Sequence, residues 1–341
     1  MKFIKILGIT TLSLILTGCL FKRDTMEDID IYTTIYPINY LTNYLYGDYS
    51  KIHSIYPSGV EVSEFNLSDK KLREYAHSDL FIFNSLDKDR DYAVKMINEN
   101  KDLKVIDTSL SVSYEYSVRE LWLNPNNFLM MAQNIKDGLN EYISNPYIND
   151  EIEKKYEELN KDLSKLDANL KEALKYATYD TLVVDSDAFK FLENLLSDKS
   201  LTIISLDKSE EVTITYTVQN GDTLDKIAKE NDVTKEDIIK LNNLQNDNIK
   251  KGDTLEINIK TISNTNINRV KKLINEGKIK YIYSFDETSN EVVNELIKDN
   301  KLTLITINDM DTIDGGVTNT NDDYLTIMNN NIDLLKKELY K

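Results

Sequence analysis

The strongest constraint on the fold is an alternation of short apolar runs and helical segments that occurs twice along the chain. In the first half, apolar runs and helical segments alternate at 29–37, 41–45, 52–56, 68–76, 80–83, 90–98 and 105–106. In the second half they alternate at 181–184, 188–196, 201–205, 266–276, 279–283, 291–299, 302–307 and 322–340. Strands that alternate with helices at this spacing predict parallel sheets covered by helices. We therefore expect an α/β fold with two lobes.

A long amphipathic helix is predicted between the two halves. It covers Asp150 to about Ala177, and it follows a shorter helical stretch, 127–144. Its apolar face recurs at helical spacing, with Glu and Lys around it, at Tyr156, Leu159, Leu163, Leu166, Leu170 and Leu174. We expect one N-terminal lobe at 29–149, a linking helix at 150–178, and a C-terminal lobe formed by 179–212 and 260–341.

The N-terminus has the features of a cleaved leader. Lys2 and Lys5 precede an apolar run, Ile6 to Leu16, which is too short to span a bilayer and is typical of a signal peptide. The following Leu16-Thr-Gly-Cys19 resembles a bacterial lipoprotein processing box. This implies removal of 1–18, acylation of Cys19, a short tether at 19–28, and a lipid anchor at the outer face of the cytoplasmic membrane.

Composition and motifs exclude several functions. The chain has 58 acidic and 41 basic residues and a net charge of −17, which argues against a nucleic-acid partner. Gly-x-Ser-x-Gly, a Gly-rich phosphate loop and Cys-x-x-Cys are all absent from the sequence. We therefore expect no enzymatic activity, although a glycosidase that uses paired carboxylates remains open because acidic residues are so frequent.

Residues 216–257 form a self-contained block inside the second half. Thr215-Tyr-Thr-Val218 predicts a strand, Gly221-Asp222 a tight turn, and Asp222 or Thr223 the start of a helix that runs to about Glu230. We expect Asn231 to end this helix in the left-handed conformation. Thr234-Lys-Glu-Asp237 is a capping-box pattern for a second helix, and Gly252-Asp253 leads into a closing strand, 254–257.

This strand-helix-helix-strand block resembles a LysM module, the domain that binds N-acetylglucosamine polymers such as peptidoglycan. We expect it to be inserted at 213–259. The resemblance implies a shallow sugar groove between two loops, with backbone and amide groups on the N-acetyl group and Leu224 and Ile249 over its methyl. The residues are Gly221, Asp222, Thr223 and Leu224 on one side and Asn246, Asp247, Asn248 and Ile249 on the other. Alternatively, they only form turns and helix caps.

The rest of the chain carries a second resemblance, from Ile29 to Lys341 outside the insertion. The matching segments are Thr34-Ile-Tyr-Pro37, Tyr56-Pro-Ser-Gly-Val-Glu61, Ala76-His-Ser-Asp-Leu80, Phe83-Asn84, Trp122-Leu-Asn-Pro125, Asp185-Ser-Asp-Ala-Phe189 and Tyr324-Leu-Thr-Ile-Met328. Together they resemble the zinc- and manganese-binding extracytoplasmic proteins of ABC importers. This implies two lobes on one rigid helix, a metal in the cleft between them, and an ABC permease as partner.

The metal positions that this resemblance implies are all substituted. The three histidines of the family correspond to Ser63, Glu120 and Ser186. The carboxylate corresponds to Phe285, with Asp286 beside it, and a late aspartate to Asn308, with Asp309 beside it. The two histidines of the chain, His53 and His77, lie at neither set of positions. A tetrahedral histidine site for zinc is therefore not expected.

Two interpretations of the cleft remain open. In the first, oxygen ligands bind a divalent cation, with Mn²⁺ or Ca²⁺ preferred to Zn²⁺. The candidate ligands are Glu61, Glu64, Glu120, Asp185, Asp187, Asp286 and Asp309. In the second, the cleft is empty and no cofactor is bound. The scaffold then presents the LysM module for wall anchoring or adhesion.

Overall fold

The computed structural model describes residues 25–311, apart from 58, 61, 63, 64 and 288, together with residues 323–341. The predicted signal peptide, Cys19 and most of the predicted tether lie outside these residues. Within the described ranges, no helix is both long enough and apolar enough to cross a membrane.

The N-terminal lobe contains a parallel four-stranded sheet with the order β2-β1-β3-β4. The strands are β1 (Ile29–Thr33), β2 (Ser50–Ser54), β3 (Leu80–Phe83) and β4 (Lys104–Asp107). The connecting helices are α1 (Tyr36–Tyr46), α2 (Asp69–Tyr75) and α3 (Asp87–Glu99), with a 3-10 turn at Gly47–Tyr49. β3 is buried along its whole length, as expected for a central parallel strand covered on both faces.

The first strand is shorter than the sequence predicts. Tyr36 and Pro37 do not continue β1 but form the first turn of α1. Proline suits this position because the first N–H groups of a helix have no intrahelical partner and its fixed φ already matches the helix. The Ile35 carbonyl accepts the N–H groups of Ile38 and Asn39, which confirms that the helix begins here.

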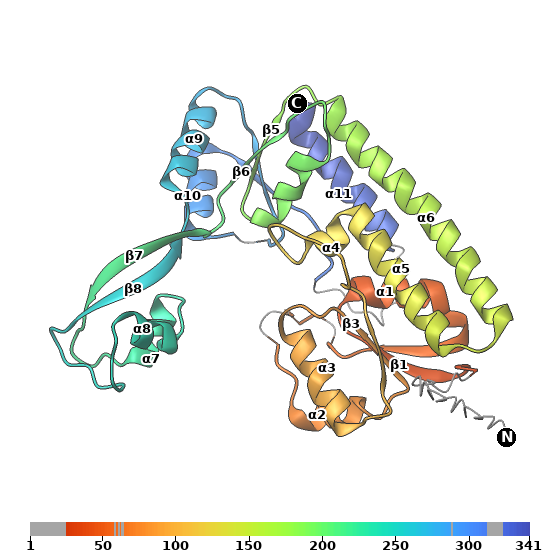
Figure 1. Ribbon diagram of the computed structural model, residues 1–341. Coiled ribbons are helices and arrows are strands. Elements are labelled where there is room, and N and C mark those ends of the chain that lie inside the picture. The colour runs from red at the N-terminus through yellow and green to blue at the C-terminus, as the bar shows by residue number, and fades with distance from the viewer. Residues whose placement is uncertain (1–24, 58, 61, 63–64, 288, 312–322) are drawn as a thin grey trace, which may run out of the picture.

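One long helix links the two lobes. It is α6 (Pro146–Lys175), which follows α4 (Glu120–Leu123) and α5 (Pro125–Tyr142). Its 30 residues correspond to about 45 Å. The predicted leucine stripe is buried, whereas Tyr156 is half-buried with the Lys136 ammonium 4.4 Å from its ring centre. Figure 1 shows α6 along one side of the molecule, beside helices of both lobes.

The C-terminal lobe repeats the parallel arrangement with the order β10-β9-β5-β6. Its strands are β5 (Thr181–Val184), β6 (Thr202–Ser205), β9 (Tyr281–Ser284) and β10 (Thr303–Thr306). Its helices are α9 (Asn264–Asn275), α10 (Glu291–Asn300) and α11 (Tyr324–Leu339).

The predicted helix at 188–196 is a 3-10 helix, η2 (Asp187–Asn194). The buried pairs Ala188 with Phe191, and Phe189 with Leu192, each lie three residues apart. Three residues per turn place such pairs on the same face, so the apolar spacing is compatible with the tighter helix.

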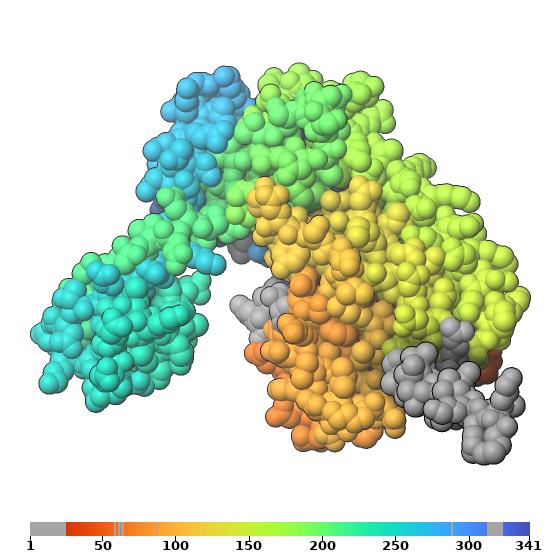
Figure 2. All heavy atoms as spheres, in the orientation of Figure 1, coloured from red at the N-terminus to blue at the C-terminus, as the bar shows by residue number. Residues whose placement is uncertain are grey.

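The insertion projects from the C-terminal lobe on an antiparallel two-stranded ribbon (Figure 1). The ribbon consists of β7 (Glu210–Thr217) and β8 (Thr254–Thr261), paired from Glu210 with Thr261 to Thr217 with Thr254. Both strands are longer than predicted. They carry α7 (Leu224–Glu230) and α8 (Lys235–Leu241), which enclose a separate small apolar core. Figure 2 shows the module standing apart from the lobes.

The helix ends of the module follow the predicted capping, with one exception. Thr223 and Thr234 accept the N–H groups of Lys226 and Asp237, as expected for N-caps. The left-handed residue after α7 is Asp232, with φ 55°, rather than Asn231, with φ −105°. The Asn231 side chain donates to the Ile227 carbonyl, which keeps Asn231 in the last turn and moves the reversal one residue on.

Candidate functional site

A cavity of about 550 Å³ lies where the carboxyl ends of the N-terminal strands face the C-terminal lobe. Its walls include Ile35, Tyr56 and Asn84, which follow β1, β2 and β3 respectively, and Asp311 from the other lobe. In open parallel sheets, ligand sites form beyond the carboxyl ends of the strands. The cavity is therefore the interlobe cleft where the resemblance predicts bound metal.

A buried polar network forms one wall of this cleft. The Tyr56 hydroxyl donates to Asp89 Oδ1 at 2.6 Å, and Asn84 Nδ2 donates to Asp89 Oδ2 at 3.1 Å. Burial, reinforced by the charge of Asp89, raises the pKa of Tyr56 well above its usual range, so the phenol remains protonated. The Asp89 carboxylate is thus held by two donors of its own lobe.

An ion pair crosses the cleft. Arg119 of the N-terminal lobe donates through Nε to Asp309 Oδ2 at 2.6 Å and through Nη2 to Asp311 Oδ2 at 3.0 Å. Burial raises the pKa of the Asp309 carboxyl despite the opposing effect of the Arg119 charge. The Trp122 indole also donates to the Asp309 carbonyl at 2.7 Å. Asp309, the candidate ligand beside the position of the family's late aspartate, therefore binds a guanidinium.

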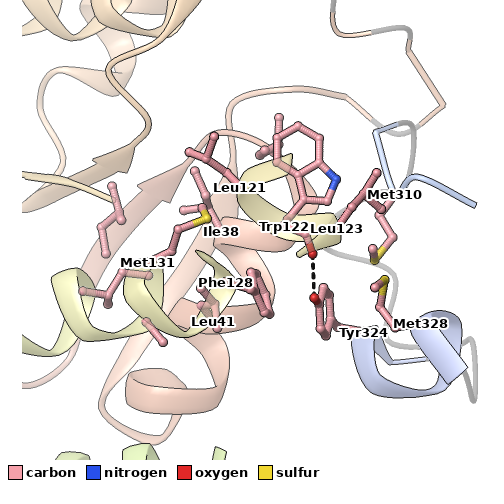
Figure 3. Close-up of a cluster of buried hydrophobic side chains, with 14 of the residues drawn as sticks. Ile38, Leu41, Leu121, Trp122, Leu123, Phe128, Met131, Met310, Tyr324 and Met328 are labelled. Carbon is pink, nitrogen blue, oxygen red and sulfur yellow. Dashed lines mark hydrogen bonds between the residues drawn. The ribbon is translucent and has the colours of Figure 1, made fainter. Parts of the chain in front are cut away.

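Aromatic packing strengthens the same lobe contact. The Tyr324 hydroxyl donates to the Trp122 carbonyl at 2.5 Å, and the Tyr324 ring stacks on Phe128 with centroids 3.9 Å apart. Figure 3 shows the Tyr324 hydroxyl directed to the backbone oxygen of Trp122, with Met310 and Met328 beside it. These contacts join α4 and α5 to α11 and fix the position of the neighbouring Arg119.

Glu120, at the place of the second family histidine, supports a loop. Its residue is 4% exposed, and its carboxylate accepts the backbone N–H groups of Glu115, Tyr116 and Ser117 at 3.2, 2.6 and 2.9 Å. A carboxylate that satisfies three backbone donors is already engaged in local structure. Its oxygens are directed to that loop.

The segment after β5 is also engaged. Ser186, at the place of the third histidine, accepts the Ala188 N–H at 3.2 Å and caps η2. Asp185 accepts the Ser289 hydroxyl at 2.6 Å, and burial raises the pKa of its carboxyl. Asp187 pairs with Lys190 at 2.8 Å. Burial acts to raise the pKa of Asp187, but hydrogen bonds from Lys190 and Ser205, together with the charge of Lys190, lower it below its usual value.

At the fourth position, an aromatic ring replaces a carboxylate. Phe285 stacks on Phe189 with centroids 4.3 Å apart, and the Arg119 guanidinium lies 5.6 Å from its ring centre. Asp286 beside it is exposed. Ser63, Glu61 and Glu64 lie outside the described residues. Among the residues that are described, no three His, Cys, Asp or Glu side chains group closely enough to hold a metal ion.

These observations do not fit a histidine-bound metal at the family position. The side chains that would face it cap η2, hold a loop, or pair with Arg119. Sequence reasoning did not identify Arg119 or Asp311 as site residues. Arg119 directly precedes the substituted Glu120 position, but its partners Asp309 and Asp311 are 190 and 192 residues away in the chain.

The predicted sugar loops of the module lie together at the free end of the ribbon. Val218 and Asp253 are joined by a 2.9 Å backbone hydrogen bond, and the Val218 carbonyl accepts the Gly252 N–H. Lys235 contacts Asp225 at the start of α7, directly after the first loop, at 3.3 Å, and Asp247 of the second loop at 2.8 Å. The two segments that the resemblance implies are therefore neighbours.

In the first loop, several predicted residues also have structural roles. Gly221 has φ +87°, a conformation that favours glycine. The Asp222 carboxylate accepts the Gln219 N–H at 2.7 Å, the Tyr216 hydroxyl at 2.8 Å and the Lys226 ammonium at 3.0 Å. These donors, with the Gln219 N–H first, lower the pKa of Asp222.

The structure requires one correction in this loop. Leu224 is 1% exposed and belongs to the apolar core of the module, so its side chain does not cover an N-acetyl methyl group as expected. The reason is its place as the first residue of α7, directed into the core. Thr223 caps that helix with its hydroxyl.

The second loop is more open. Asn246, Asp247 and Asn248 are exposed, and Ile249 is half-buried. Asn246 Oδ1 accepts the Asn248 N–H at 3.0 Å, which fixes a local turn. The side-chain amide of Asn248 points to no partner within the described residues. Glycan binding by these residues stays a prediction.

Two parallel-sheet lobes on one long helix, with a cavity at their shared cleft, define the class of two-lobed extracytoplasmic binding proteins. The chain belongs to the ZnuA family, zinc-uptake complex component A, whose family model matches residues 31–235, more than half of the chain. A LysM domain model matches residues 216–258. Both resemblances are thus confirmed, as is the α/β fold.

Curated relatives are distant. The zinc-binding lipoprotein AdcA of Streptococcus pneumoniae is 20% identical, over 99% of this chain and 61% of the relative. The metal ABC transporter substrate-binding lipoprotein FimA of Streptococcus parasanguinis is 25% identical, over 51% of this chain and 61% of the relative. The chain thus spans about 61% of the length of each of these two relatives.

Solved structures share the fold. The Zn(II)-bound ZnuA-like domain of Streptococcus pneumoniae AdcA matches with a TM-score of 0.61 and 18% identity, covering 92% of this chain and 100% of that domain. The metal-dependent lipoprotein YcdH of Bacillus subtilis matches with a TM-score of 0.63 and 17% identity, covering 92% and 100%. At this identity the likeness establishes the architecture alone.

Proposed function

We propose that the protein is a lipid-anchored envelope protein that binds peptidoglycan through its LysM domain. One observation carries this proposal. Two loops with exposed amide groups, 219–224 and 246–249, lie together at the end of a ribbon that places them away from the lobes. Acylation of Cys19 would hold the N-terminus of the protein at the outer face of the cytoplasmic membrane.

Co-sedimentation of the full chain with purified peptidoglycan tests this proposal. Asn248→Ala removes an exposed amide from the second loop, and we expect it to lower the bound fraction several-fold. Asn268→Ala is the matched control, because Asn268 is an exposed asparagine on α9. Equal sedimentation of both variants and the parent would refute loop binding, and no sedimentation of the parent would refute the function.

The second candidate function is that of a solute receptor for an ABC importer. The cleft cavity favours it, because its polar wall of Tyr56, Asn84 and Asp89 is suited to a small polar solute. The relatives named zinc-binding suggest a divalent cation as cargo. Here the Arg119 ion pair and the substituted positions argue against zinc, and Mn²⁺ or Ca²⁺ would need oxygen ligands.

Calorimetry on metal-stripped protein tests the metal version of this candidate. If the cleft binds a cation, titration of Zn²⁺, Mn²⁺ or Ca²⁺ into the full chain would show saturable binding of one ion per protein. Our account predicts no such binding. We assign no catalytic step to the chain, because its family consists of binding proteins and Arg119, Asp309 and Asp311 at the cleft are paired with one another.

A further inference from the structure

A second groove of about 840 Å³ lies on the module, nearer the base of the ribbon than the sugar loops. The ribbon contributes one wall, and the loop before α8 together with α8 contributes the other. The lining residues include Glu211, Asn258 and Lys260 on the ribbon and Val233, Asp237 and Leu241 opposite. Leu241 is 37% exposed, so the groove has an accessible apolar side. Figure 1 shows α8 beside the ribbon.

The side chain of Asn242 shows which way the free edge of β8 faces. Its Nδ2 donates to the Glu256 carbonyl at 2.7 Å, and its Oδ1 accepts the Glu256 N–H at 2.8 Å. Both backbone groups of Glu256 are therefore turned away from β7. The carboxamide of Asn242 pairs with β8 as the peptide group of an additional strand would.

The register extends this edge into the groove. Glu256 faces Thr215 in a pair that is not hydrogen-bonded across the ribbon, and such pairs alternate along antiparallel strands. Asn258, opposite Thr213, and Lys260 therefore also turn their N–H and C=O groups outward. Within the described residues, no hydrogen bond uses these outward groups. The groove thus contains an unpaired strand edge at Asn258 and Lys260, next to Glu256, whose outward groups are bonded to Asn242.

The chemistry of this edge selects a peptide. Outward N–H and C=O groups that recur about every 7 Å match the repeat of an extended peptide, which can add to a free strand edge. Lys240 and Lys260 lie in the groove with Glu211 and Asp237, so the walls present both charges. A short peptide with carboxylate and amine groups complements such walls.

The position of the groove favours a peptide attached to the glycan. Asn258 lies four residues along β8 from Thr254, which pairs with Thr217 beside the sugar loops. Four residues of a strand span about 13 Å. A peptide that branches from a sugar chain held in the loops would reach the groove after about four extended residues.

We infer that the groove between α8 and the free edge of β8 binds the peptide branch of peptidoglycan by strand addition. The inference rests on the proposed function, since the glycan loops deliver the peptide to the groove. It assigns the module two contacts with one polymer, sugar at the tip and peptide along the edge. Peptide-bearing strands then bind more tightly than bare glycan.

Two proline variants of the full chain test this inference. Asn258→Pro removes the outward N–H of β8 without removing a ladder hydrogen bond. Thr213→Pro is its matched control, because it changes the facing residue of the same pair on the opposite edge. Both variants also lose the 2.6 Å hydrogen bond between Thr213 and Asn258. Leu241→Ser, on the other wall, provides a variant that leaves the ribbon unchanged.

The readout is a ratio of two dissociation constants. The constant for peptidoglycan strands stripped of peptide by an amidase is divided by the constant for intact strands. We expect a ratio of roughly fivefold or more for the parent and for Thr213→Pro. Asn258→Pro and Leu241→Ser should bring it near one while leaving the affinity for stripped strands unchanged.

The outcomes separate the two proposals. A parent ratio near one, or equal ratios for Asn258→Pro and Thr213→Pro, would overturn the peptide groove while glycan binding stands. If the proline variants fail to fold, an unchanged ratio in Leu241→Ser overturns it. Absence of binding to either kind of strand by the parent would instead refute the proposed function.

Discussion

The interlobe cleft and the inserted module use their polar groups differently. In the cleft, two substituted family positions are engaged within the protein, Glu120 by three backbone N–H groups and Ser186 as the cap of η2. The neighbouring candidate Asp309 is paired with Arg119. In the module, internal bonds fix the first loop through Asp222, while the asparagines of the second loop face solvent. A retained fold therefore does not imply a retained site, whereas an open surface leaves room for a ligand.

The largest expected effect concerns the ion pair across the cleft. Arg119→Ala would leave Asp309 and Asp311, whose side chains are 12% and 11% exposed, without their cation. We expect a loss of about 2–3 kcal/mol in the free energy of unfolding, because breaking a largely buried pair strands its partner charges. Urea unfolding followed by the fluorescence of Trp122, the only tryptophan in the chain, measures this loss in the lobes.

Lys71→Ala is the control for that experiment. Lys71 pairs with Glu74 on the surface, where both side chains are at least half exposed. An exposed pair contributes about 0–1 kcal/mol. Equal losses of unfolding free energy in the two variants would show that the Arg119 ion pair does not hold the two lobes together.

Glu120 should have the next largest effect. Glu120→Gln replaces a charged acceptor of three backbone donors with a neutral amide of lower acceptor capacity. We expect a loss of about 2 kcal/mol, because hydrogen bonds to a charged group are the stronger ones. The same Trp122 signal reports it, with Glu115→Gln as the control. A variant as stable as the parent would mean that Glu120 remains available to a ligand.

Acid should weaken the module through Asp222. Its pKa is lower folded than unfolded, so its stabilisation is present above the unfolded pKa and disappears as the pH falls through the folded value. We expect faster amide exchange at 217–226 as the pH falls below about 4, beyond the intrinsic pH dependence of exchange. Asp222→Asn should show fast exchange already at neutral pH and little further change. Identical profiles would exclude Asp222 as the cause.

The smallest effect is expected at Lys235, which links the start of α7 to the second sugar loop. Its contacts with Asp225 and Asp247 involve exposed carboxylates, so Lys235→Ala should change stability by no more than about 1 kcal/mol. It should nevertheless reduce peptidoglycan affinity a few-fold, because the loops lose a shared restraint. Lys229→Ala on α7 is the control. Unchanged affinity would show that the loops are held by other contacts.

Much of the fold follows from local sequence patterns. The leucine stripe of α6 predicted its buried face, and the capping threonines 223 and 234 predicted both helix starts of the module. Errors arose where two local signals compete. Pro37 fits a strand end or a first helical turn, and the apolar residues at 188–192 fit either kind of helix until their packing is known.

The candidate site was harder to predict because its contacts are remote in sequence. The sequence shows that the family's histidines are substituted at Ser63, Glu120 and Ser186. It does not show which contacts these side chains make in place of a metal. The Arg119 pair joins residues 190 positions apart, and no periodic pattern links them. Leu224 shows the reverse difficulty, since a residue next to a binding loop can belong to the core.

Hydrogen exchange of the full chain, with and without a soluble peptidoglycan fragment, tests the contrast between cleft and module most directly. Our account predicts slower exchange at 219–224 and 246–249 in the presence of the fragment, and no change at 115–123 around Arg119 and Glu120. Protection at 115–123 with none in the module loops would contradict it.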